Sequence, residues 1–304
     1  MFNILVTGGT GFIGSHLCEE LIRQKHCINV LTSSGNTDNL ASITGNNRLA
    51  VIKADISDYN GLKKKLAAKK FDIIFHLASY IPLGIYDDNK KCVEINDLGT
   101  KNILQIARVV GCNKFIYSST GWVYGHPKHI PIDEDHPLNP FDAYGKTKLN
   151  GEKHCKIYSK YMNIIILRYA GVYGPRKNKG AVYNFIKNML EKKTITIHSD
   201  GTQTNDYVYV QDIVNSNILA MKALDVIQFD IFNIGGGKEI AANQLAILIG
   251  NLLKTKSIIV YTKTPVTNKR YLLDIKKAQK KLLFQPTELK ICLKEFIPYV
   301  KNIK

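Results

Sequence analysis

The sequence predicts an α/β protein with a doubly wound parallel sheet and a smaller C-terminal lobe. Short, almost continuously apolar runs rich in Ile and Val alternate with longer amphipathic segments. This alternation is typical of parallel strands joined by helices that cover both faces of a sheet. In addition, a glycine-rich turn follows the first apolar run and opens the first amphipathic segment. Phosphate-binding loops occupy that position in sheets of this kind.

The predicted elements alternate regularly through the first half of the chain. The strand-like runs are NILVTG (3–8), INVLTS (28–33), LAVIKAD (49–55), FDIIFHLAS (71–79), KFIYSS (114–119) and NIIILRYAGVYG (163–174). The helical segments between them are SHLCEELIRQ (15–24), YNGLKKKLAAKK (59–70) and NDLGTKNILQIARVVG (96–111). Beyond Gly174 the pattern loosens into loops before two further strand-to-helix passages. We therefore expect a first domain over residues 1–170 and a smaller lobe over residues 171–304, with segments of the lobe returning to the first domain.

Composition and charge narrow the classes of function. The 304 residues carry a net charge of +17, but the lysines are spread over many segments without interleaved aromatic residues. A Lys-rich solvated surface is therefore favoured over a nucleic-acid site. The six cysteines are scattered with no C-x-x-C pair, which argues against disulfides and bound metal and predicts a reducing, cytoplasmic environment. No apolar stretch approaches the ~20 residues of a membrane span, and no signal-like segment precedes the first strand, so we expect no membrane association.

The turn VTGGTGFIGSH places Gly8, Gly11 and Gly14 at G-x-x-G-x-x-G spacing between the first strand and the first helix. Glycine at these positions allows a tight turn, close approach of a pyrophosphate and close packing of helix on strand, while the helix N-terminus attracts phosphate. Glycine also serves ordinary turns, but at this position of a βαβ unit a dinucleotide site is the favoured interpretation. We expect Phe12 and Ile13 of the same turn to bind the dinucleotide with the three glycines.

The end of the second strand predicts which dinucleotide is bound. A site for NAD has an acidic residue about 20 residues after the glycines, which holds the ribose 2′-hydroxyl. Here that stretch contains Thr32, Ser33 and Ser34, which tolerate a 2′-phosphate that a carboxylate would repel. We therefore expect these residues to bind cofactor and NADP(H) to be preferred over NAD(H). After the third strand, Asp55 is a candidate for the adenine edge or, equally, for a helix cap.

Tyr144 and Lys148 stand four residues apart in YGKTK, so they would share one face of a helix. A Lys ammonium near a phenol favours the phenolate and lowers the phenol pKa from about 10 toward neutrality. A phenol tuned in this way can transfer a proton at ordinary pH. Taken alone, such a pair is more often part of a solvated helix surface, and the other motifs decide between the two.

Several motifs stand in one order along the chain: TGGTGFIG, KADIS, HLAS, NDLGTKNIL, SSTGWVYG, YGKTK and LRYAGVYGPR. Together they resemble the extended short-chain dehydrogenase/reductase family, in particular its sugar-nucleotide epimerase/dehydratase branch, over nearly the whole chain. The resemblance implies a Rossmann domain, a substrate-binding C-terminal lobe and a nucleotide-sugar substrate. It implies that Tyr144 exchanges a proton with a substrate oxygen, Thr120 orients that oxygen, and Lys148 binds the nicotinamide ribose and lowers the Tyr pKa. The further cofactor residues implied by the motifs are Asp55, Ile56, Leu77, Ala78, Tyr144 and Lys148.

The chain departs from the family pattern at positions that contact substrate. Gly121 and Trp122 replace the acidic pair that follows the catalytic Thr in the dehydratases, and the related decarboxylases also use an acid there, so neither reaction is expected. Gly171 replaces an Asn that touches the nucleotide-sugar, and Asn205 replaces a diphosphate-binding Arg, a change that is not neutral for phosphate recognition. The substrate-binding residues implied by the matches are Thr120, Gly121, Trp122, Tyr144, Gly171, Arg176 and Asn205.

Other basic residues are candidates to replace the lost arginine contacts. Lys269 and Arg270 are near the position of a second expected Arg. Arg176, Lys177 and Lys179 could compensate as well, although a basic loop is as often only solvated.

Three functions are compatible with these motifs. We favour NADPH-dependent reduction of a nucleotide-linked 4-keto-6-deoxy sugar. The alternative is a nucleotide-sugar 4-epimerase, which uses the same three catalytic residues and retains its cofactor, typically NAD held by an acidic ribose anchor that this chain lacks. The third is a non-catalytic NADP-sensing protein on the same fold. The intact set of Thr120, Tyr144 and Lys148 argues against the third.

The resemblance also predicts a homodimer. Members of the family commonly dimerise through two helices, which match NILQIARVV (102–110) and LNGEKHCKIYSKYM (149–162) here. Both segments carry apolar and aromatic residues that could form such an interface or could equally pack against the sheet within one subunit.

Overall fold

The computed structural model describes residues 1–82, 89–263 and 270–303. These residues form two compact units, each of which is discontinuous in sequence. The first unit comprises residues 1–125, 138–168 and 214–232, and the second comprises residues 126–137, 169–213 and the described part of 233–304. None of the described helices is both long and apolar enough to span a membrane.

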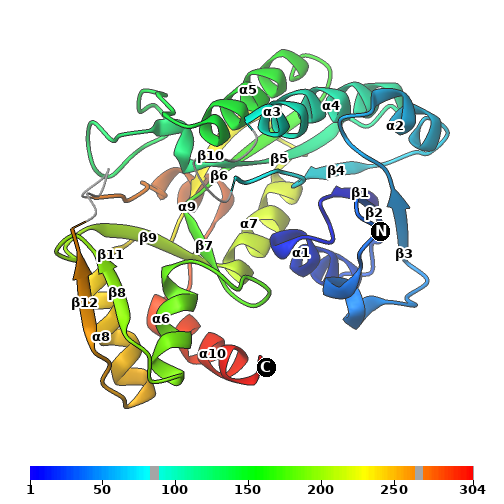
Figure 1. Cartoon of the computed structure of the whole chain (residues 1–304). Helices are drawn as coiled ribbons and strands as arrows, with labels where there is room; N and C mark the ends of the chain where they lie inside the picture. The colour runs from blue at the N-terminus through cyan, green and yellow to red at the C-terminus, as the bar shows by residue number, and fades with distance from the viewer. Residues whose placement is uncertain (83–88, 264–269, 304) are drawn as a thin grey trace. The chain divides into compact units, whose positions relative to one another are not determined.

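A mostly parallel sheet of seven strands dominates the first unit (Figure 1). Its strands are β1 (Asn3–Thr7), β2 (Cys27–Thr32), β3 (Leu49–Lys53), β4 (Ile73–His76), β5 (Lys114–Thr120), β6 (Asn163–Tyr169) and β10 (Phe229–Ile234). Their order in the sheet is β10-β6-β5-β4-β1-β2-β3. Strand β1 pairs in parallel with both β2 and β4, so the chain winds away from it in both directions. This arrangement confirms the predicted doubly wound sheet. Sheets of this kind bind ligands at the carboxyl ends of the strands where the order reverses, which are β1 and β4 here.

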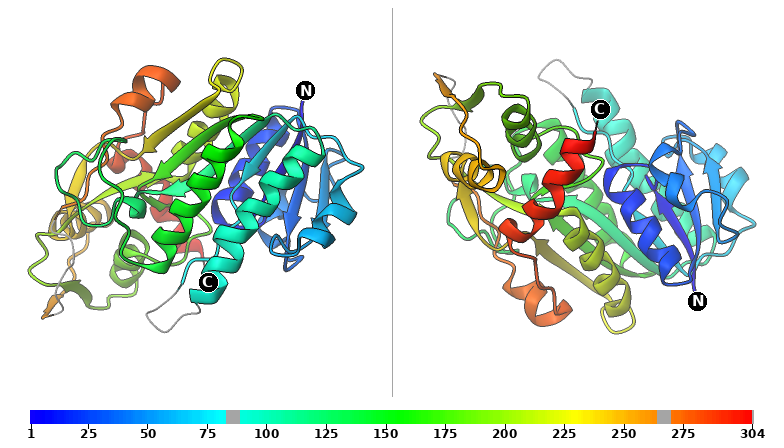
Figure 2. Two further views of the ribbon diagram at one scale, coloured as in Figure 1. Left: turned by 90° about the horizontal axis from the view of Figure 1, so that it is seen from above. Right: turned by 90° about the horizontal axis from the view of Figure 1, so that it is seen from below.

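Helices cover both faces of this sheet, because each connection between parallel strands must cross over one face. The helices are α1 (Phe12–Arg23), α2 (Tyr59–Leu66), α3 (Asn89–Cys92), α4 (Gly99–Val109), α5 (Ala143–Tyr158) and α7 (Val210–Ala223). Helices α2, α4 and α5 lie over one face, and α1 and α7 lie over the other (Figures 1 and 2). Shorter helical segments are η1 (Asp38–Ile43), η2 (Val93–Leu98) and η3 (Gly121–Tyr124), of which η2 is a π-helix continuous with α3 and α4.

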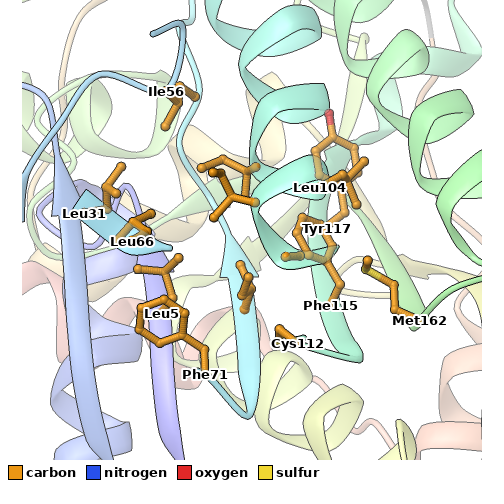
Figure 3. Packing of buried hydrophobic residues seen from close by; sticks show 14 of the residues in the cluster. Leu5, Leu31, Ile56, Leu66, Phe71, Leu104, Cys112, Phe115, Tyr117 and Met162 are labelled. Carbon is orange, nitrogen blue, oxygen red and sulfur yellow. The ribbon is translucent and has the colours of Figure 1, made fainter. Parts of the chain in front are cut away.

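The core of the first unit fills the layer between the sheet and its helices. Leu5, Leu31 and Phe115 project from three strands and meet Leu66 and Leu104 from the covering helices (Figure 3). All five side chains are almost completely buried. Each contributes roughly 1.5–3 kcal/mol of hydrophobic stabilisation. The continuous apolar runs therefore correspond to strands that are buried on both faces, except for the edge strand β3, whose residues are half-buried or exposed.

The second unit contains two small sheets and four helices in the described residues. The strands are β7 (Gly171–Tyr173), β8 (Ile195–His198), β9 (Thr204–Tyr209), β11 (Glu239–Ala241) and β12 (Ile259–Thr262), and the helices are α6 (Ala181–Leu190), α8 (Ala242–Leu253), α9 (Lys276–Leu282) and α10 (Leu289–Asn302). The sheets have the orders β11-β9-β7 and β12-β8. Buried Ile186, Leu245 and Phe296 bring three of the helices into one core.

Asp206 joins β9 to two neighbouring segments of the second unit. Its buried carboxylate accepts hydrogen bonds from the backbone N–H groups of Gly236 (2.7 Å) and Leu273 (3.3 Å). Burial raises the pKa of Asp206 to about 7, although these two hydrogen bonds lower it. The carboxylate therefore has a structural task, which is to hold a glycine-rich turn against the strand.

Candidate active site

The predicted site residues fall into two groups. Those expected to bind cofactor or to catalyse all lie in the first unit, at the carboxyl ends of parallel strands or on α5. The glycine turn follows β1, Thr32 ends β2, Asp55 and Ile56 follow β3, Leu77 and Ala78 follow β4, and Thr120 ends β5. Gly171, Arg176 and Asn205, expected to bind substrate, lie in the second unit.

The glycines of the first turn are required for different reasons. Gly8 has φ +69°, and a Cβ there would lie only 2.7 Å from the backbone nitrogen of Ala78. A Cβ on Gly14 would clash with the carbonyl oxygen of Gly8. At Gly11, by contrast, the nearest atom to an added Cβ would be the same oxygen at 3.1 Å, so the chain itself tolerates a side chain there more readily. The fold therefore accounts for Gly8 and Gly14, whereas a side chain at Gly11 would require only a small shift of the Gly8 carbonyl group.

This turn fits a dinucleotide pyrophosphate. Gly11 is the N-cap of α1 and offers no capping side chain to the first turn of the helix. A helix N-terminus carries partial positive charge and favours a bound anion. The helix N-terminus at Gly11 provides partial positive charge, and the absence of a side chain there lets a pyrophosphate approach the backbone.

The end of β2 is a network of hydroxyl groups. The Thr32 hydroxyl lies 3.2 Å from that of Thr10 and 3.4 Å from that of Ser34, and it accepts from the N–H of Gly35 at 3.4 Å. Lys53 at the end of β3 packs beside the same turn, with its Nζ 3.9 Å from the Cβ position of Gly35. Lys53 reaches this turn from the neighbouring strand, because β2 and β3 pair with Thr32 opposite Lys53.

Asp55 does not cap the following helix. Its carboxylate accepts from the backbone N–H (2.9 Å) and the hydroxyl (2.8 Å) of Ser57, which forms a local turn. The N-cap of α2 is Asp58, which accepts from the N–H of Gly61 at 2.9 Å. The cap alternative for Asp55 is therefore wrong, and the adenine-edge role stays a prediction.

Helix α5 carries Tyr144 and Lys148 on one face, as their spacing predicts. Asp142 begins the helix by accepting from the N–H of Gly145 at 2.6 Å. The Tyr144 hydroxyl is hydrogen-bonded to the side chains of Ser79 and Thr120. Three hydroxyl groups from the end of β4, the end of β5 and the first turn of α5 thus converge at one point above the sheet edge.

The pKa values differ from the simple expectation for a Tyr–Lys pair. Burial raises the pKa of Tyr144 to about 12, and the hydrogen bonds from Ser79 and Thr120 only partly offset this effect. Burial also lowers the pKa of Lys148 to about 7. Its ammonium stands 4.3 Å from the centre of the Tyr117 ring. In the protein alone, burial is therefore the largest influence on the pKa of both groups.

The buried ammonium gives a testable pH dependence of stability. The pKa of Lys148 falls from 10.5 to about 7 on folding, so the unfolded chain binds more protons between these values. Stability should therefore rise with pH across this window, by up to about 1.4 kcal/mol per pH unit from this group. Urea unfolding at pH 7 and pH 9.5 should show a larger gain for the wild type than for Lys148→Met. Equal gains in the two proteins would contradict the depressed pKa.

Asn96 and Ser79 also shape the site, although the sequence analysis assigned no role to either residue. Asn96, buried in the π-helix, accepts from the Ser79 hydroxyl (3.0 Å) and the Tyr80 N–H (2.7 Å), and it donates to the Tyr80 carbonyl (2.9 Å). It thereby fixes the segment that presents Ser79 to Tyr144. Both residues lie within motifs that the sequence shows, HLAS and NDLGTKNIL, but their spacing alone does not reveal that they meet.

His76 is a second buried partner. Its ring nitrogens lie 2.6 Å from the Thr7 hydroxyl and 3.0 Å from the Thr100 hydroxyl, and its ring stacks on Tyr117. Burial and the nearby Lys148 lower the pKa of His76 to about 3, so the ring is neutral. The Thr7 hydroxyl in turn accepts from the N–H of Ala78 at 3.2 Å. This chain of hydrogen bonds fixes the crossover that Gly8 contacts.

Beneath Thr120, a buried ion pair joins α5 to the sheet. Arg168 of β6 donates to the Glu152 carboxylate through Nη2 (2.6 Å) and Nε (3.0 Å). Its Nη1 donates to the Tyr124 hydroxyl at 2.9 Å, and Ser119 donates to Glu152 at 2.5 Å. The network ties β5, η3, β6 and α5 together directly behind the catalytic candidates.

Gly121 and Trp122 begin η3 immediately after Thr120. The Trp122 N–H donates to the Thr120 hydroxyl at 3.3 Å, which caps this short helix. The indole of Trp122 packs against the ring of Phe141, with centroids 5.5 Å apart. The position therefore carries an aromatic surface in place of an acid.

The candidates in the second unit have local structural partners. Gly171 pairs with Tyr207 across the β7–β9 ladder, and a Cβ there would lie 2.9 Å from the carbonyl oxygen of Asp206. Asn205 is hydrogen-bonded to Tyr207, and Arg176 has φ +71° and donates its backbone N–H to the Tyr299 hydroxyl at 2.8 Å. These contacts leave the substrate roles of the three residues as predictions.

The basic residues that are candidates to replace the lost arginine contacts have different partners. The Arg270 guanidinium is paired with the Glu239 carboxylate, with Nε 3.0 Å from one oxygen. Lys177 donates to the Val172 carbonyl at 2.6 Å, and burial followed by the charge of Lys179 lowers its pKa. Lys269 lies outside the described residues.

Comparisons with known proteins agree with this geometry. The NAD dependent epimerase/dehydratase family model matches residues 4–235. A putative UDP-glucose 4-epimerase from Methanocaldococcus jannaschii is 35% identical over 316 residues, covering 98% of both chains.

Two solved structures are similar over almost the full length. UDP-glucose 4-epimerase from Thermotoga maritima with UDP-glucose gives a TM-score of 0.89 at 32% identity, covering 98% of both chains. A Tyr-to-Phe mutant of UDP-glucuronic acid 4-epimerase from Bacillus cereus, with UDP-4-deoxy-4-fluoro-glucuronic acid and NAD, gives 0.90 at 32% identity, covering 99% of this chain and 100% of that one. With its glycine turn, its sheet order and the Thr–Tyr–Lys set, the chain belongs to the NAD dependent epimerase/dehydratase family, within the extended short-chain dehydrogenase/reductases.

Proposed function

We propose that the protein is an NAD(P)-dependent 4-epimerase of UDP-linked sugars. The observation that carries this proposal is the convergence of the Ser79, Thr120 and Tyr144 hydroxyl groups on the sheet edge that also holds the glycine turn. The similar proteins described above are 4-epimerases of UDP-glucose and UDP-glucuronic acid. They favour the epimerase alternative over the reduction of a 4-keto-6-deoxy sugar that we preferred from the sequence.

Each residue of the set has a separate task in this proposal. When bound, NAD(P) supplies a reversible two-electron oxidation at a carbinol carbon. As the phenolate, Tyr144 would take the proton of the C4 hydroxyl, and as the phenol so formed it would return that proton to the same oxygen, so it serves both epimers. Thr120 hydrogen-bonds this oxygen and orients it, and Lys148 holds the ribose hydroxyls next to the phenol. Ser79 and Asn96 keep the Tyr144 hydroxyl in position.

The test is incubation of the purified protein with UDP-glucose or UDP-galactose and catalytic amounts of NAD or NADP. We expect each sugar to convert into the other until the same equilibrium mixture is reached from both sides, with no net consumption of cofactor. Proton NMR of the anomeric region separates the two epimers. If the protein instead oxidises NADPH in proportion to a UDP-linked 4-keto-6-deoxy sugar and leaves both hexoses unchanged, the reductase is the correct function.

The ribose end of the cofactor site supports a preference for NADP over NAD. The Thr32 hydroxyl network replaces a carboxylate, and the Lys53 ammonium lies next to the same turn. We therefore expect NADP to bind more tightly than NAD, although the similar Bacillus cereus enzyme was solved with NAD.

Thr32→Asp should make NAD bind more tightly than NADP, because the carboxylate accepts from the 2′-hydroxyl and repels a 2′-phosphate. Calorimetric titration with both dinucleotides measures this, and Thr32→Ser is the matched control that keeps the hydroxyl. An unchanged preference in Thr32→Asp would show that this turn does not contact the ribose.

We also propose that the protein is a homodimer through η2, α4 and α5. Leu98 and Ile157 are exposed apolar residues on this helical layer. Light scattering should give twice the mass of the chain. Leu98→Glu combined with Ile157→Glu should give monomers, because burying two carboxylates in an apolar interface is unfavourable. Ile247→Glu, which changes an equally apolar exposed residue on α8, should stay dimeric. A monomeric wild type would contradict the proposal.

A further inference from the structure

Trp122 and Phe141 form an exposed aromatic pair beside the catalytic candidates. The two residues are 51% and 41% exposed, and their ring centroids lie 5.5 Å apart at an angle of 56°. Large aromatic side chains lose hydrophobic stabilisation when they remain in water. A pair of this size next to a reaction centre therefore suggests a surface that a ligand covers.

The backbone under this pair is tightly fixed. The Trp122 N–H is bonded to the Thr120 hydroxyl, and the Trp122 carbonyl oxygen lies so close to α5 that a Cβ on Gly145 would be 2.8 Å from it. The same Cβ would lie 2.9 Å from the side chain of Pro140, next to Phe141. The backbone of Trp122 is therefore fixed between Thr120 and the first turn of α5, which carries Tyr144.

The chemistry of the substrate determines what this surface contacts. If Thr120 and Tyr144 hold the C4 oxygen, the nearest ring carbons that the adjacent aromatic surface can contact are the neighbours of C4, which are C3 and C5. The C5 carbon carries C6, where a neutral hexose has a hydroxymethyl group and a hexuronate has a carboxylate. The faces of aromatic rings carry partial negative charge and accept C–H groups, whereas a carboxylate against them loses its hydration without gaining a partner.

We propose that Trp122 and Phe141 form an aromatic platform for the C–H face of the sugar ring, which selects neutral UDP-hexoses over UDP-hexuronates. This inference rests on the proposed 4-epimerase function and names its class of substrate. Both classes occur among the similar enzymes, since one acts on UDP-glucose and another on UDP-glucuronic acid. The platform is thus the feature that distinguishes between them in this chain.

The first test uses the fluorescence of the protein itself. Trp122 is the only tryptophan of the 304 residues, so its emission reports on this position alone. Titration with UDP-glucose should change the emission, whereas titration with UDP, which lacks the sugar, should change it much less. Identical changes with both ligands, or none with either, would mean that the sugar does not contact the indole. Because this measurement needs no turnover, it tests contact between the sugar and the indole even if the proposed reaction is not observed.

The second test compares epimerisation of UDP-glucose and UDP-glucuronic acid. The wild type should prefer UDP-glucose in kcat/KM by at least about 100-fold, the scale at which a mismatched binding site rejects a substrate. Trp122→Ala should lower kcat/KM for UDP-glucose by about 10- to 100-fold, mainly through KM, and should reduce the preference. Trp122→Phe keeps an aromatic face and should retain most of the kcat/KM for UDP-glucose and most of the preference. Phe141→Leu should lower both quantities, as Trp122→Ala does.

Tyr261→Ala is the matched control, because Tyr261 on β12 is an aromatic residue with the same 51% exposure. Tyr261→Ala should leave kcat/KM for both UDP-glucose and UDP-glucuronic acid unchanged. If the wild type epimerises UDP-glucuronic acid as efficiently as UDP-glucose, the 4-epimerase function stands and the platform is wrong. A preference that survives unchanged in Trp122→Ala also overturns the platform. Absence of any epimerisation by the wild type refutes the proposed function instead.

Discussion

Tyr144→Phe is expected to lower the turnover of UDP-sugars by about 10² to 10⁴, the usual scale for the loss of a general acid–base group. The substitution keeps the ring and its packing on α5 but removes the atom that is hydrogen-bonded to Ser79 and Thr120. The C4 oxygen then has no group that can take or return its proton. Dinucleotide affinity should hardly change, because the phenol is not expected to anchor the cofactor. Steady-state kinetics and calorimetry on the same preparation measure the two quantities.

Two other variants separate the tasks within the set. Thr120→Val has almost the same shape without the hydroxyl, so it should lower the rate and leave dinucleotide affinity intact. Lys148→Ala should reduce both the rate and the dinucleotide affinity, because the same ammonium contacts the ribose of the cofactor and the phenol of Tyr144 in the proposed function. Near-normal turnover by Tyr144→Phe would remove the proposed mechanism and most of the argument for catalysis at this site.

Glu152→Leu is expected to destabilise the protein by about 3–5 kcal/mol, because it leaves the Arg168 guanidinium buried without its counter-charge. Both side chains are almost fully buried, and the carboxylate receives two hydrogen bonds from Arg168 and one from Ser119. The pair lies directly behind Thr120, so the variant should also lose activity. Urea unfolding followed by circular dichroism measures the change in the free energy of unfolding.

The double variant Glu152→Leu with Arg168→Met is the informative comparison. Replacing a whole buried ion pair with apolar residues of similar volume is often neutral or stabilising. We therefore expect the double variant to recover most of the stability that the single variant loses. If both proteins are equally unstable, the loss comes from packing rather than from an uncompensated charge.

The sequence was sufficient to predict the sheet and most of the residues that lie at the carboxyl ends of its strands. The glycine turn, the hydroxyl groups after β2 and the Tyr–Lys spacing are local patterns, and local patterns determine which residues reach the carboxyl ends of parallel strands. The pKa of Tyr144 was predicted in the wrong direction, because the argument considered a neighbouring charge and not burial. Burial depends on the whole fold and is not visible in a four-residue spacing.

Other features escaped prediction because they join segments that are distant in the sequence. The contact between Asn96 and Ser79 spans 17 residues, and Lys53 approaches the β2 turn only because β2 and β3 pair. The preference for a reductase rested on one missing acidic residue after β2. A single position is weak evidence about a reaction, since it affects only how the ribose is held.

Because η2 is a π-helix, the number of residues in this part of the chain matters more for the direction of the flanking helices than the identity of its exposed residues. A π-turn holds one more residue than an α-turn, which rotates the helix before it by about 100° relative to the helix after it. Within this turn Asn96 contacts Ser79 and Tyr80, while Asp97, the next residue, accepts from Asn150 and His154 of α5 at 2.7 Å each. Deleting one residue between Val93 and Leu98 would restore a regular α-helix and rotate α3 by about 100° relative to α4. Homologous proteins should therefore vary in sequence at exposed positions such as Val93, but they should tolerate neither insertion nor deletion within this turn.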